Sequence, residues 1–129
     1  MTRPLDATRI GAAAVALVWW YEGLWDKVLG GSPDQRAIVA AVPWLPARAV
    51  TAAVLGIGLA EVALGAWALS GWRPRPAAVV QTGALVAFNA GGLAFGAAHV
   101  PDPAGMLVRN VAFLALVWLV ALRTKGSAG

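Results

Sequence analysis

Four apolar segments, each about as long as a helix that crosses a bilayer, account for most of this chain. They cover residues 10–29, 47–70, 77–98 and 104–122, and a transmembrane helix needs about 20 predominantly apolar residues. Prolines lie between these segments, where they do not interrupt helical hydrogen bonding; they are Pro43, Pro46, Pro74, Pro76, Pro101 and Pro103. We therefore predict an all-α fold, a four-helix transmembrane bundle formed by one domain over residues 1–129.

Composition supports a membrane protein rather than a soluble one. Apolar residues make up 60% of the chain and charged residues only 12%, and the mean hydropathy is +0.71; soluble domains carry about 25% charged residues. The net charge of +4 does not indicate nucleic-acid binding, because the arginines lie singly at the ends of apolar segments. The chain has no cysteine, which excludes disulfides, thiolate metal sites and cysteine redox chemistry.

The basic residues predict the orientation in the membrane. Four crossings place both termini on one side, and the side with more lysine and arginine is normally the cytoplasmic one. We expect a multi-pass protein of the cell membrane with both termini in the cytoplasm. The inner side would carry Arg3, Arg9, Arg73, Arg75, Arg123 and Lys125, and the outer side Lys27, Arg36, Arg48 and Arg109.

The connection after the first apolar segment contains a helix start signal. Ser32 is followed by Pro33 and, three residues after the serine, by Gln35, which is the pattern of a capping box with proline at the first helical position. We expect a short interfacial helix here, which lies flat on the outer surface between the first and second transmembrane helices.

Polar residues inside the apolar segments predict a layer near the outer side. With a rise of ~1.5 Å per residue, Glu22 and Asn89 both lie ~18 Å from the cytoplasmic face, and Asn110 lies ~9 Å from the outer face. One interpretation is an outward-opening pocket floored by these residues. The alternative is interhelical bonding, with Glu22 paired to Arg109 and the asparagines bonded across helices. The pocket rim would consist of Asp26, Lys27, His99 and Asp102.

Glu61 is the most deeply placed acid. It lies ~20 Å from the outer face, and no lysine or arginine lies within two turns on its own helix. Gln81 comes to a similar depth and is the predicted partner. Because a buried carboxyl group favours its neutral form, we expect Glu61 to donate a hydrogen bond. It would then either tie the second and third helices together or serve as a proton or ligand site.

The candidate ligand-binding residues follow from these considerations, and Glu61 and Glu22 are also candidates for a catalytic acid. No metal site is expected, because His99 is the only histidine and a site needs more ligands than one histidine and scattered acids. The predicted ligand-binding set is Glu22, Glu61, Gln81, Asn89, Arg109 and Asn110.

Several stretches resemble a known family when they are taken in order: "EGLWDK" at 22–27, "EVALGAWALSG" at 61–71 and "DPAGMLVRN" at 102–110, together with Arg9 and Gln81. On these stretches the chain is similar to the DoxX-like family of small four-helix membrane proteins. Some relatives are subunits of thiosulfate:quinone oxidoreductase, and others anchor assemblies that handle thiol and oxidative stress. The resemblance therefore implies contact with a quinone or with a redox partner. Because this chain lacks cysteine, thiosulfate turnover would require a partner.

Three functions stay open at this point. The first is an accessory or quinone- or lipid-binding subunit of a membrane redox assembly, with no covalently bound cofactor and a quinone as the candidate ligand. The second is a self-contained membrane enzyme that uses acid–base chemistry on a hydrophobic small molecule. The third is a structural anchor for a soluble partner. The expected partners are membrane lipid, a quinone or similar small molecule, a redox protein and a second copy of the chain, but no nucleic acid.

Overall fold

The computed structural model describes residues 7–124, which are helical almost throughout and contain no strand. This confirms the all-α class. The elements in chain order are α1 (Ala7–Trp20), the π-helix η1 (Tyr21–Val28), α2 (Pro33–Ala40), the 3-10 turn η2 (Ala47–Ala49), α3 (Val50–Ser70), α4 (Pro74–Gly96), the 3-10 turn η3 (Ala97–His99) and α5 (Pro103–Arg123).

Three helical segments of the described chain are long and apolar enough to cross a membrane: Ala47–Ser70, Pro74–His99 and Pro103–Arg123. The segment formed by α1 and η1 does not belong to this set. α1 has only 14 residues, and η1 carries Glu22, Asp26 and Lys27. The fourth crossing thus stays a prediction.

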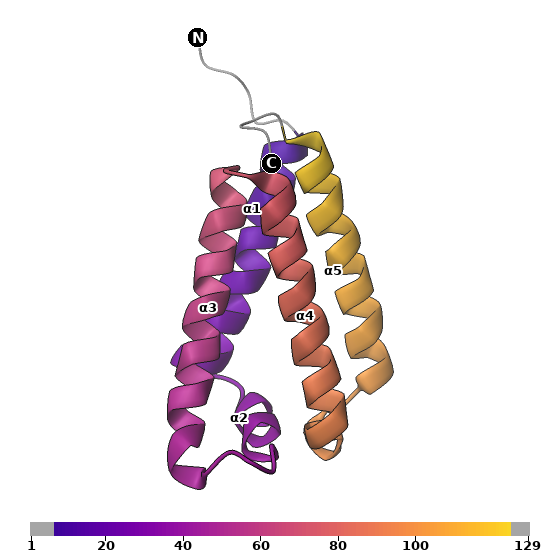
Figure 1. Cartoon of the computed structure of the whole chain (residues 1–129). Coiled ribbons are helices and arrows are strands. Elements are labelled where there is room, and N and C mark those ends of the chain that lie inside the picture. Colours follow the sequence, from indigo (N-terminus) through magenta and orange to yellow (C-terminus); the bar gives the residue numbers. More distant parts are fainter. Residues whose placement is uncertain (1–6, 125–129) are drawn as a thin grey trace.

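The long helices run side by side, with the start of α1, the end of α5 and the α3–α4 connection at one end of the bundle (Figure 1). We call this the Arg73 end, after the residue in that connection, and the other the α2 end. α1 and η1 pack along α3, α1 also packs on α5, and α4 packs on α5. By contrast, α3 and α4 diverge toward the α2 end (Figure 1). Arg3 and Lys125, used in the orientation prediction, lie outside the described residues.

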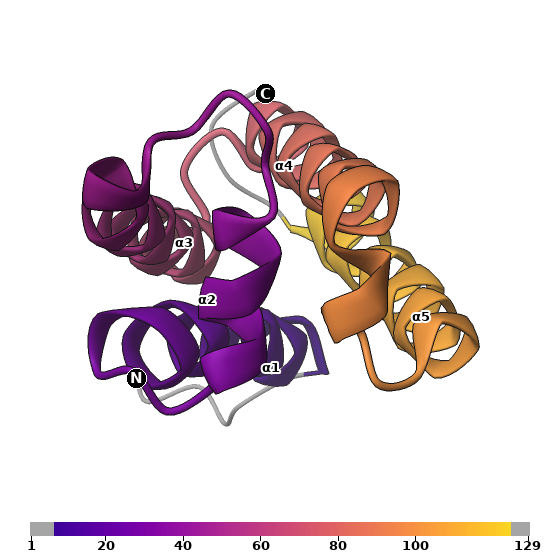
Figure 2. The ribbon, with the colours of Figure 1, turned by 90° about the horizontal axis from the view of Figure 1, so that it is seen from below.

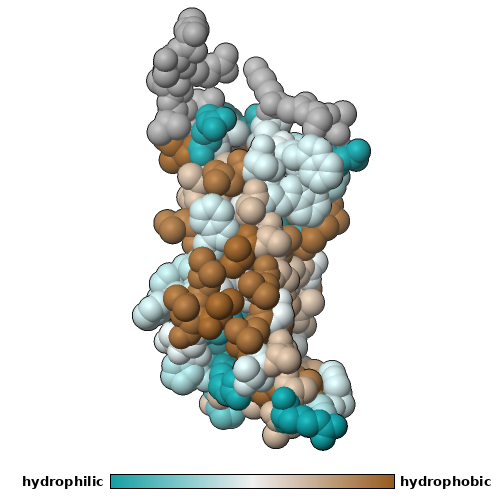
Figure 3. All heavy atoms as spheres, turned by 90° about the vertical axis from the view of Figure 1, so that its left-hand side faces the viewer, coloured by the Kyte–Doolittle hydropathy of each residue, from teal (hydrophilic) through white to brown (hydrophobic). Residues whose placement is uncertain are grey.

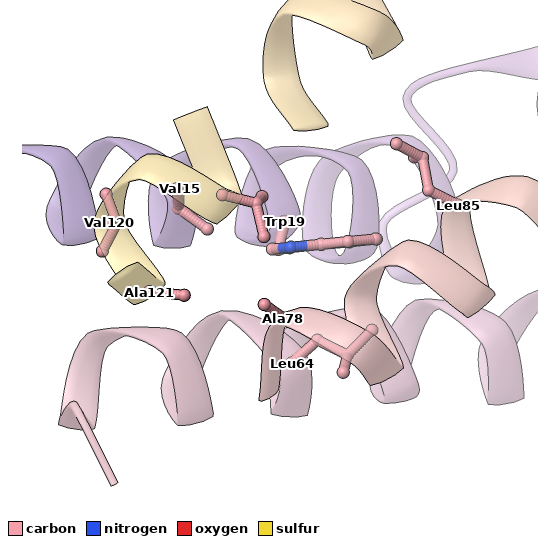
Figure 4. Close-up of a cluster of buried hydrophobic side chains, with 8 residues drawn as sticks. Val15, Trp19, Leu64, Ala78, Leu85, Val120 and Ala121 are labelled. Carbon is pink, nitrogen blue, oxygen red and sulfur yellow. The ribbon is translucent and has the colours of Figure 1, made fainter. Parts of the chain in front are cut away.

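Buried side chains from α1, α3, α4 and α5 form the hydrophobic core (Figure 4). Its largest member is Trp19, which has 0% of its surface exposed and packs edge-on against Phe113 at 5.5 Å between ring centroids. α1 and α5 approach so closely that a Cβ atom on Gly11 would lie 2.7 Å from a methyl carbon of Val120. Small residues therefore permit the tight helix contact expected in lipid.

A second close approach, between η1 and α3, fixes the position of one helix relative to the other along the bundle. A Cβ atom on Gly23 would lie 2.5 Å from the Gly58 carbonyl oxygen, and one on Gly58 would lie 2.8 Å from the Gly23 carbonyl oxygen. Only glycine fits this crossing on both sides. The same crossing brings Lys27 beside Gly58 and Glu61 beside Gly23.

Three of the prolines that we expected between helices belong to helix starts instead. α4 begins at Pro74 rather than residue 77, so that Pro74 and Pro76 both lie in its first turn. α5 likewise begins at Pro103. The first-turn N–H groups of a helix have no intrahelical partner, so proline costs little there and its fixed φ suits the helix.

The short helix α2 begins at Pro33 as its sequence signal indicates, but the predicted capping bond is absent. The Ser32 side chain makes no cap hydrogen bond. Instead, α2 is held by Ile38, which lies so close to α4 that a Cβ atom on Gly96 would come within 2.8 Å of it. Seen from the α2 end, α2 lies between the α1–α3 pair and the α4–α5 pair (Figure 2).

Candidate functional site

A cavity of about 560 Å³ lies at the α2 end and is lined by η1, α2, α3, α4 and the start of α5. Its volume is in the range of small-molecule sites, about 300–1,000 Å³. Most of the predicted site and rim residues line it, whereas Gln81 and His99 do not. Those that line it are Glu22, Asp26, Lys27, Glu61, Asn89, Asp102, Arg109 and Asn110.

The π-helical form of η1 decides which of its residues face the cavity. In a π-helix the hydrogen bonds join residues five apart, so residues five apart also share a face. Glu22 and Lys27 have this spacing and both line the cavity, together with Asp26. The sequence carries no sign of this winding, and an ordinary α-helix would place Glu22 and Lys27 on different faces.

Glu61 is paired with Lys27. The Lys27 Nζ atom lies 2.7 Å from Glu61 Oε1, and the exposed fractions of the two side chains are 7% and 2%. The same carboxylate oxygen has no hydrogen bond of suitable angle in the described chain, so the ammonium group is the contact that offsets its burial. The predicted partner, Gln81, is wrong, because Glu61 contacts the Lys27 ammonium group instead.

The prediction failed because depth was counted from the end of each helix as if all ends were level. The Gly23–Gly58 crossing instead sets η1 and α3 at heights that bring Lys27 to Glu61. Lysine also has a long flexible stem, so its ammonium group reaches a neighbouring helix.

Gln81 lies in the core rather than at the cavity. Its Oε1 atom accepts a hydrogen bond of 2.8 Å from the Trp19 indole, and its Nε2 atom donates to the Ala77 carbonyl at 3.1 Å. The residue therefore joins α4 to α1, which is a structural use of the amide. Trp19 was not predicted as the donor to Gln81, although a buried indole N–H needs an acceptor.

The two asparagines form the bond that the interhelical alternative predicted and also line the cavity. Asn110 Nδ2 donates to Asn89 Oδ1 at 2.6 Å, and Asn89 Nδ2 donates to the Leu85 carbonyl at 2.7 Å. Each amide nitrogen carries two N–H groups, and the Asn110 oxygen is an acceptor. The pair thus ties α4 to α5 and still offers polar atoms to a ligand.

Acidic residues outnumber basic residues around the cavity. Four acidic residues line it, against Lys27 and Arg109. The Glu22–Arg109 ion pair of the interhelical alternative is not formed; within residues 7–124 the ion pair is that of Lys27 with Glu61. Glu22 and Asp26 thus face the cavity without a salt-bridge partner there, and Arg109 offers an exposed guanidinium group.

The remaining predicted rim residues have different positions. Asp102 caps α5, because its Oδ1 atom accepts a hydrogen bond of 3.1 Å from the Gly105 N–H, yet it lines the cavity as well. His99 lies exposed in η3. Among the described residues, no group of three His, Cys, Asp or Glu side chains could hold a metal ion.

The apolar residues that line the cavity were not predicted from the sequence. They include Ile57 on α3, Leu85 and Phe88 on α4 and Ile38 on α2. In a membrane protein, an apolar residue that faces a cavity has the same hydropathy as one that faces lipid. These positions are therefore seen only in the packed structure.

Comparison with known families gives one result. Residues 16–118 match the family model described as the DoxX-like family. Comparison with curated proteins and with solved structures gives no match. The matched range runs from the core of α1 to the last turns of α5 and includes each residue that lines the cavity.

Proposed function

The chain belongs to the DoxX-like family, and from this premise we propose that it is a four-span membrane subunit whose cavity binds a quinone or a lipid headgroup within a redox assembly. The observation that carries the proposal is the cavity itself. Charged and amide groups from η1, α3, α4 and α5 converge there on a space otherwise lined by apolar side chains, which is the usual composition of a site for an amphipathic small molecule.

A fourth span formed by α1 and η1 is part of this proposal. α1 exposes Ile10 (57%) and Leu17 (66%) to the surroundings, as expected of a helix in lipid. The charged residues of η1 line the cavity instead, where they are sheltered from hydrocarbon. On the face shown in Figure 3, hydrophobic side chains form a band between hydrophilic groups near both ends of the bundle.

We further propose that the Arg73 end is cytoplasmic and the α2 end faces outward. Arg9, Arg73, Arg75 and Arg123 lie at the Arg73 end of the described chain. Under the positive-inside rule this cluster favours the cytoplasm. The cavity would then open in the outer half of the cell membrane, with α2 at the outer interface.

A quinone head requires hydrogen-bond donors, because its carbonyl oxygens are acceptors. Arg109 and the free N–H groups of Asn89 and Asn110 supply them at the cavity. A lipid headgroup that carries hydroxyl or ammonium groups would instead use the Glu22 and Asp26 carboxylates. No thiol of this chain takes part, so electrons in a redox assembly would come from a partner.

The enzyme alternative uses Glu61 or Glu22 as the acid, and the anchor alternative uses the basic Arg73 end to bind a soluble partner. Glu22 is the better placed of the two acids, because Glu61 is engaged by Lys27. The anchor alternative does not explain why both polar and apolar residues line a cavity of this size, whereas the enzyme alternative would use the same cavity.

The test is to recover small molecules from protein held in lipid nanodiscs and to identify them by mass spectrometry. We expect a quinone or a specific lipid in stoichiometric amount. Arg109→Gln should weaken the retention of a quinone about 10–100-fold, the loss expected when a charged hydrogen bond of about 1.5–3 kcal/mol is removed. Arg36→Gln is the matched control, since Arg36 is an exposed arginine at the same end that does not line the cavity.

Protein that retains neither quinone nor lipid would contradict the proposal. Bulk phospholipid that is retained equally by the Arg109 and Arg36 variants would favour the structural anchor. Turnover of a hydrophobic substrate by the isolated protein, lost in Glu22→Gln or Glu61→Gln, would favour the enzyme.

A further inference from the structure

The cavity has a polar side and an apolar side. On the side of η1 and α5, its lining includes Glu22, Asp26 and Arg109. On the side where α3 faces α4, the lining consists largely of apolar residues: Ile57 on α3 and Leu85, Ala87, Phe88 and Gly91 on α4. A ligand that satisfies both sides has a polar head and an apolar part.

The apolar side is open to the outside of the bundle. α3 and α4 diverge there (Figure 1), and Phe88 lines the cavity although 38% of its surface is exposed. A Cβ atom added to Gly91 would meet no atom within 4 Å. α3 and α4 both belong to segments that are apolar enough to cross a membrane, so in the proposed membrane arrangement the gap between them would face hydrocarbon.

The end of the cavity is covered in part by α2 and by the connection that follows it. α2 lies across it (Figure 2), with Ile38 seated in the space left by Gly92 and Gly96 on α4. The connection from α2 to α3 adds Trp44, whose ring packs edge-on against Phe95 of α4 at 4.9 Å between centroids. These contacts cover the lower edge of the α3–α4 gap.

From this arrangement we propose that the ligand is a membrane amphiphile that reaches the cavity sideways, through the gap between α3 and α4. Its head lies toward η1 and α5, and its apolar tail passes between Ile57 and Phe88 into the bilayer. The inference rests on the proposed function and adds to it the ligand class and the route. A water-soluble molecule of the same head chemistry lacks the tail contacts and binds more weakly.

The test narrows the gap without disturbing the head site. Gly91→Leu places a side chain in open space at the gap. Gly83→Leu is the matched control, because Gly83 lies on the same helix, also has open space around it and does not line the cavity. Both changes raise helix propensity equally, so a difference between the variants reports the gap. Ala87→Leu, at a second lining position, serves if the first variant fails to fold.

Two probes that share one head distinguish the contacts of the tail from those of the head. One is a benzoquinone with a decyl tail, and the other is the same benzoquinone with a methyl group. Binding is measured on the full chain in nanodiscs. We expect Gly91→Leu to weaken the decyl probe about tenfold, the loss expected when about two methylene groups of the tail give up their contacts. It should leave the methyl probe unchanged, and Gly83→Leu should change neither.

Equal affinity of the Gly91 and Gly83 variants for the decyl probe would overturn the sideways route, and so would equal losses for both probes. If neither probe binds the original protein but phospholipid co-purifies with it, the same two variants are compared by the phospholipid each retains. A lower amount in Gly91→Leu supports the route, and equal amounts refute it. Absence of any bound probe or lipid refutes the proposed function instead.

Discussion

At the Arg73 end, Trp19 and its neighbours pack with almost no exposed surface, whereas at the α2 end Glu22, Asn89 and Arg109 surround a space of about 560 Å³. α3, α4 and α5 contribute to both regions. Toward the Arg73 end small residues let α1 and α5 approach closely. Toward the α2 end η1 stays packed on α3, whereas α3 and α4 diverge around α2 (Figure 1). A tightly packed half can thus carry the stability that an open, polar half gives up for binding.

The Lys27–Glu61 ion pair gives the strongest test of this difference between the two halves, because it is a stabilising contact in the half that contains the cavity. Lys27→Met leaves a buried carboxylate without its partner, which should lower the free energy of unfolding by about 3–5 kcal/mol. Thermal or denaturant unfolding in detergent micelles measures this. Adding Glu61→Gln should restore most of the loss, because it removes the unpaired charge.

The control for that change is Arg48→Met, which removes an exposed cation near the same end. We expect its stability to stay within about 0.5 kcal/mol of the original protein. An equally stable Lys27→Met protein would show that the pair adds nothing to folding.

In the packed half, Trp19→Phe should remove the hydrogen bond to Gln81 and leave the amide oxygen buried without a donor. The expected loss is about 1–3 kcal/mol, read from the same unfolding measurement, with ligand retention per folded protein unchanged. Trp25→Phe makes the same chemical change at a half-exposed position on η1 and should have little effect. A Trp19 variant that lost ligand but kept its stability would contradict the assignment of stability to the packed half and of binding to the open half.

The asparagine pair lies at the boundary of the two regions. Asn110→Ala removes its interhelical hydrogen bond, and such bonds contribute about 0.6 kcal/mol on average, and at most about 1.7 kcal/mol, in membrane proteins. A double-mutant cycle with Asn89→Ala isolates this coupling. A coupling near zero together with weaker ligand retention would assign the pair to binding alone.

Arg109 should have the smallest effect on stability. It is exposed and forms no ion pair in the described chain, so Arg109→Gln should shift the free energy of unfolding by no more than about 0.5 kcal/mol. The unfolding curve checks this. A loss of several kcal/mol would mean that the open half depends on the guanidinium group for its structure.

Hydropathy alone was sufficient to predict the helical class, and the order of short stretches was sufficient to identify the family, which the match over residues 16–118 confirms. Those properties depend on composition along single segments. Three of the predicted spans have the length and hydropathy of membrane helices. The first segment stays a predicted membrane span, because the charged residues of η1 lower the hydropathy of its outer part.

Pairing between helices could not be predicted in the same way. The partner of Glu61 depends on the relative height and rotation of η1 and α3, which the Gly23–Gly58 crossing sets. The role of Gln81 depends on an indole from another helix. Counting residues from helix ends places Glu22 and Asn89 at one level, and both line the cavity, but it contains no information about rotation.

The winding of η1 has one more consequence. A π-turn takes up one residue more than an α-turn, so rewinding η1 as an α-helix would push the surplus residue into the adjoining stretch, where Gly30 already adopts a left-handed φ of 71°. Residues beyond the rewound turn would rotate by about 100°, which would carry the Lys27 ammonium away from Glu61. The Lys27–Glu61 salt bridge and the π-helical winding of η1 therefore depend on each other, and a change that disrupts one would also disrupt the other.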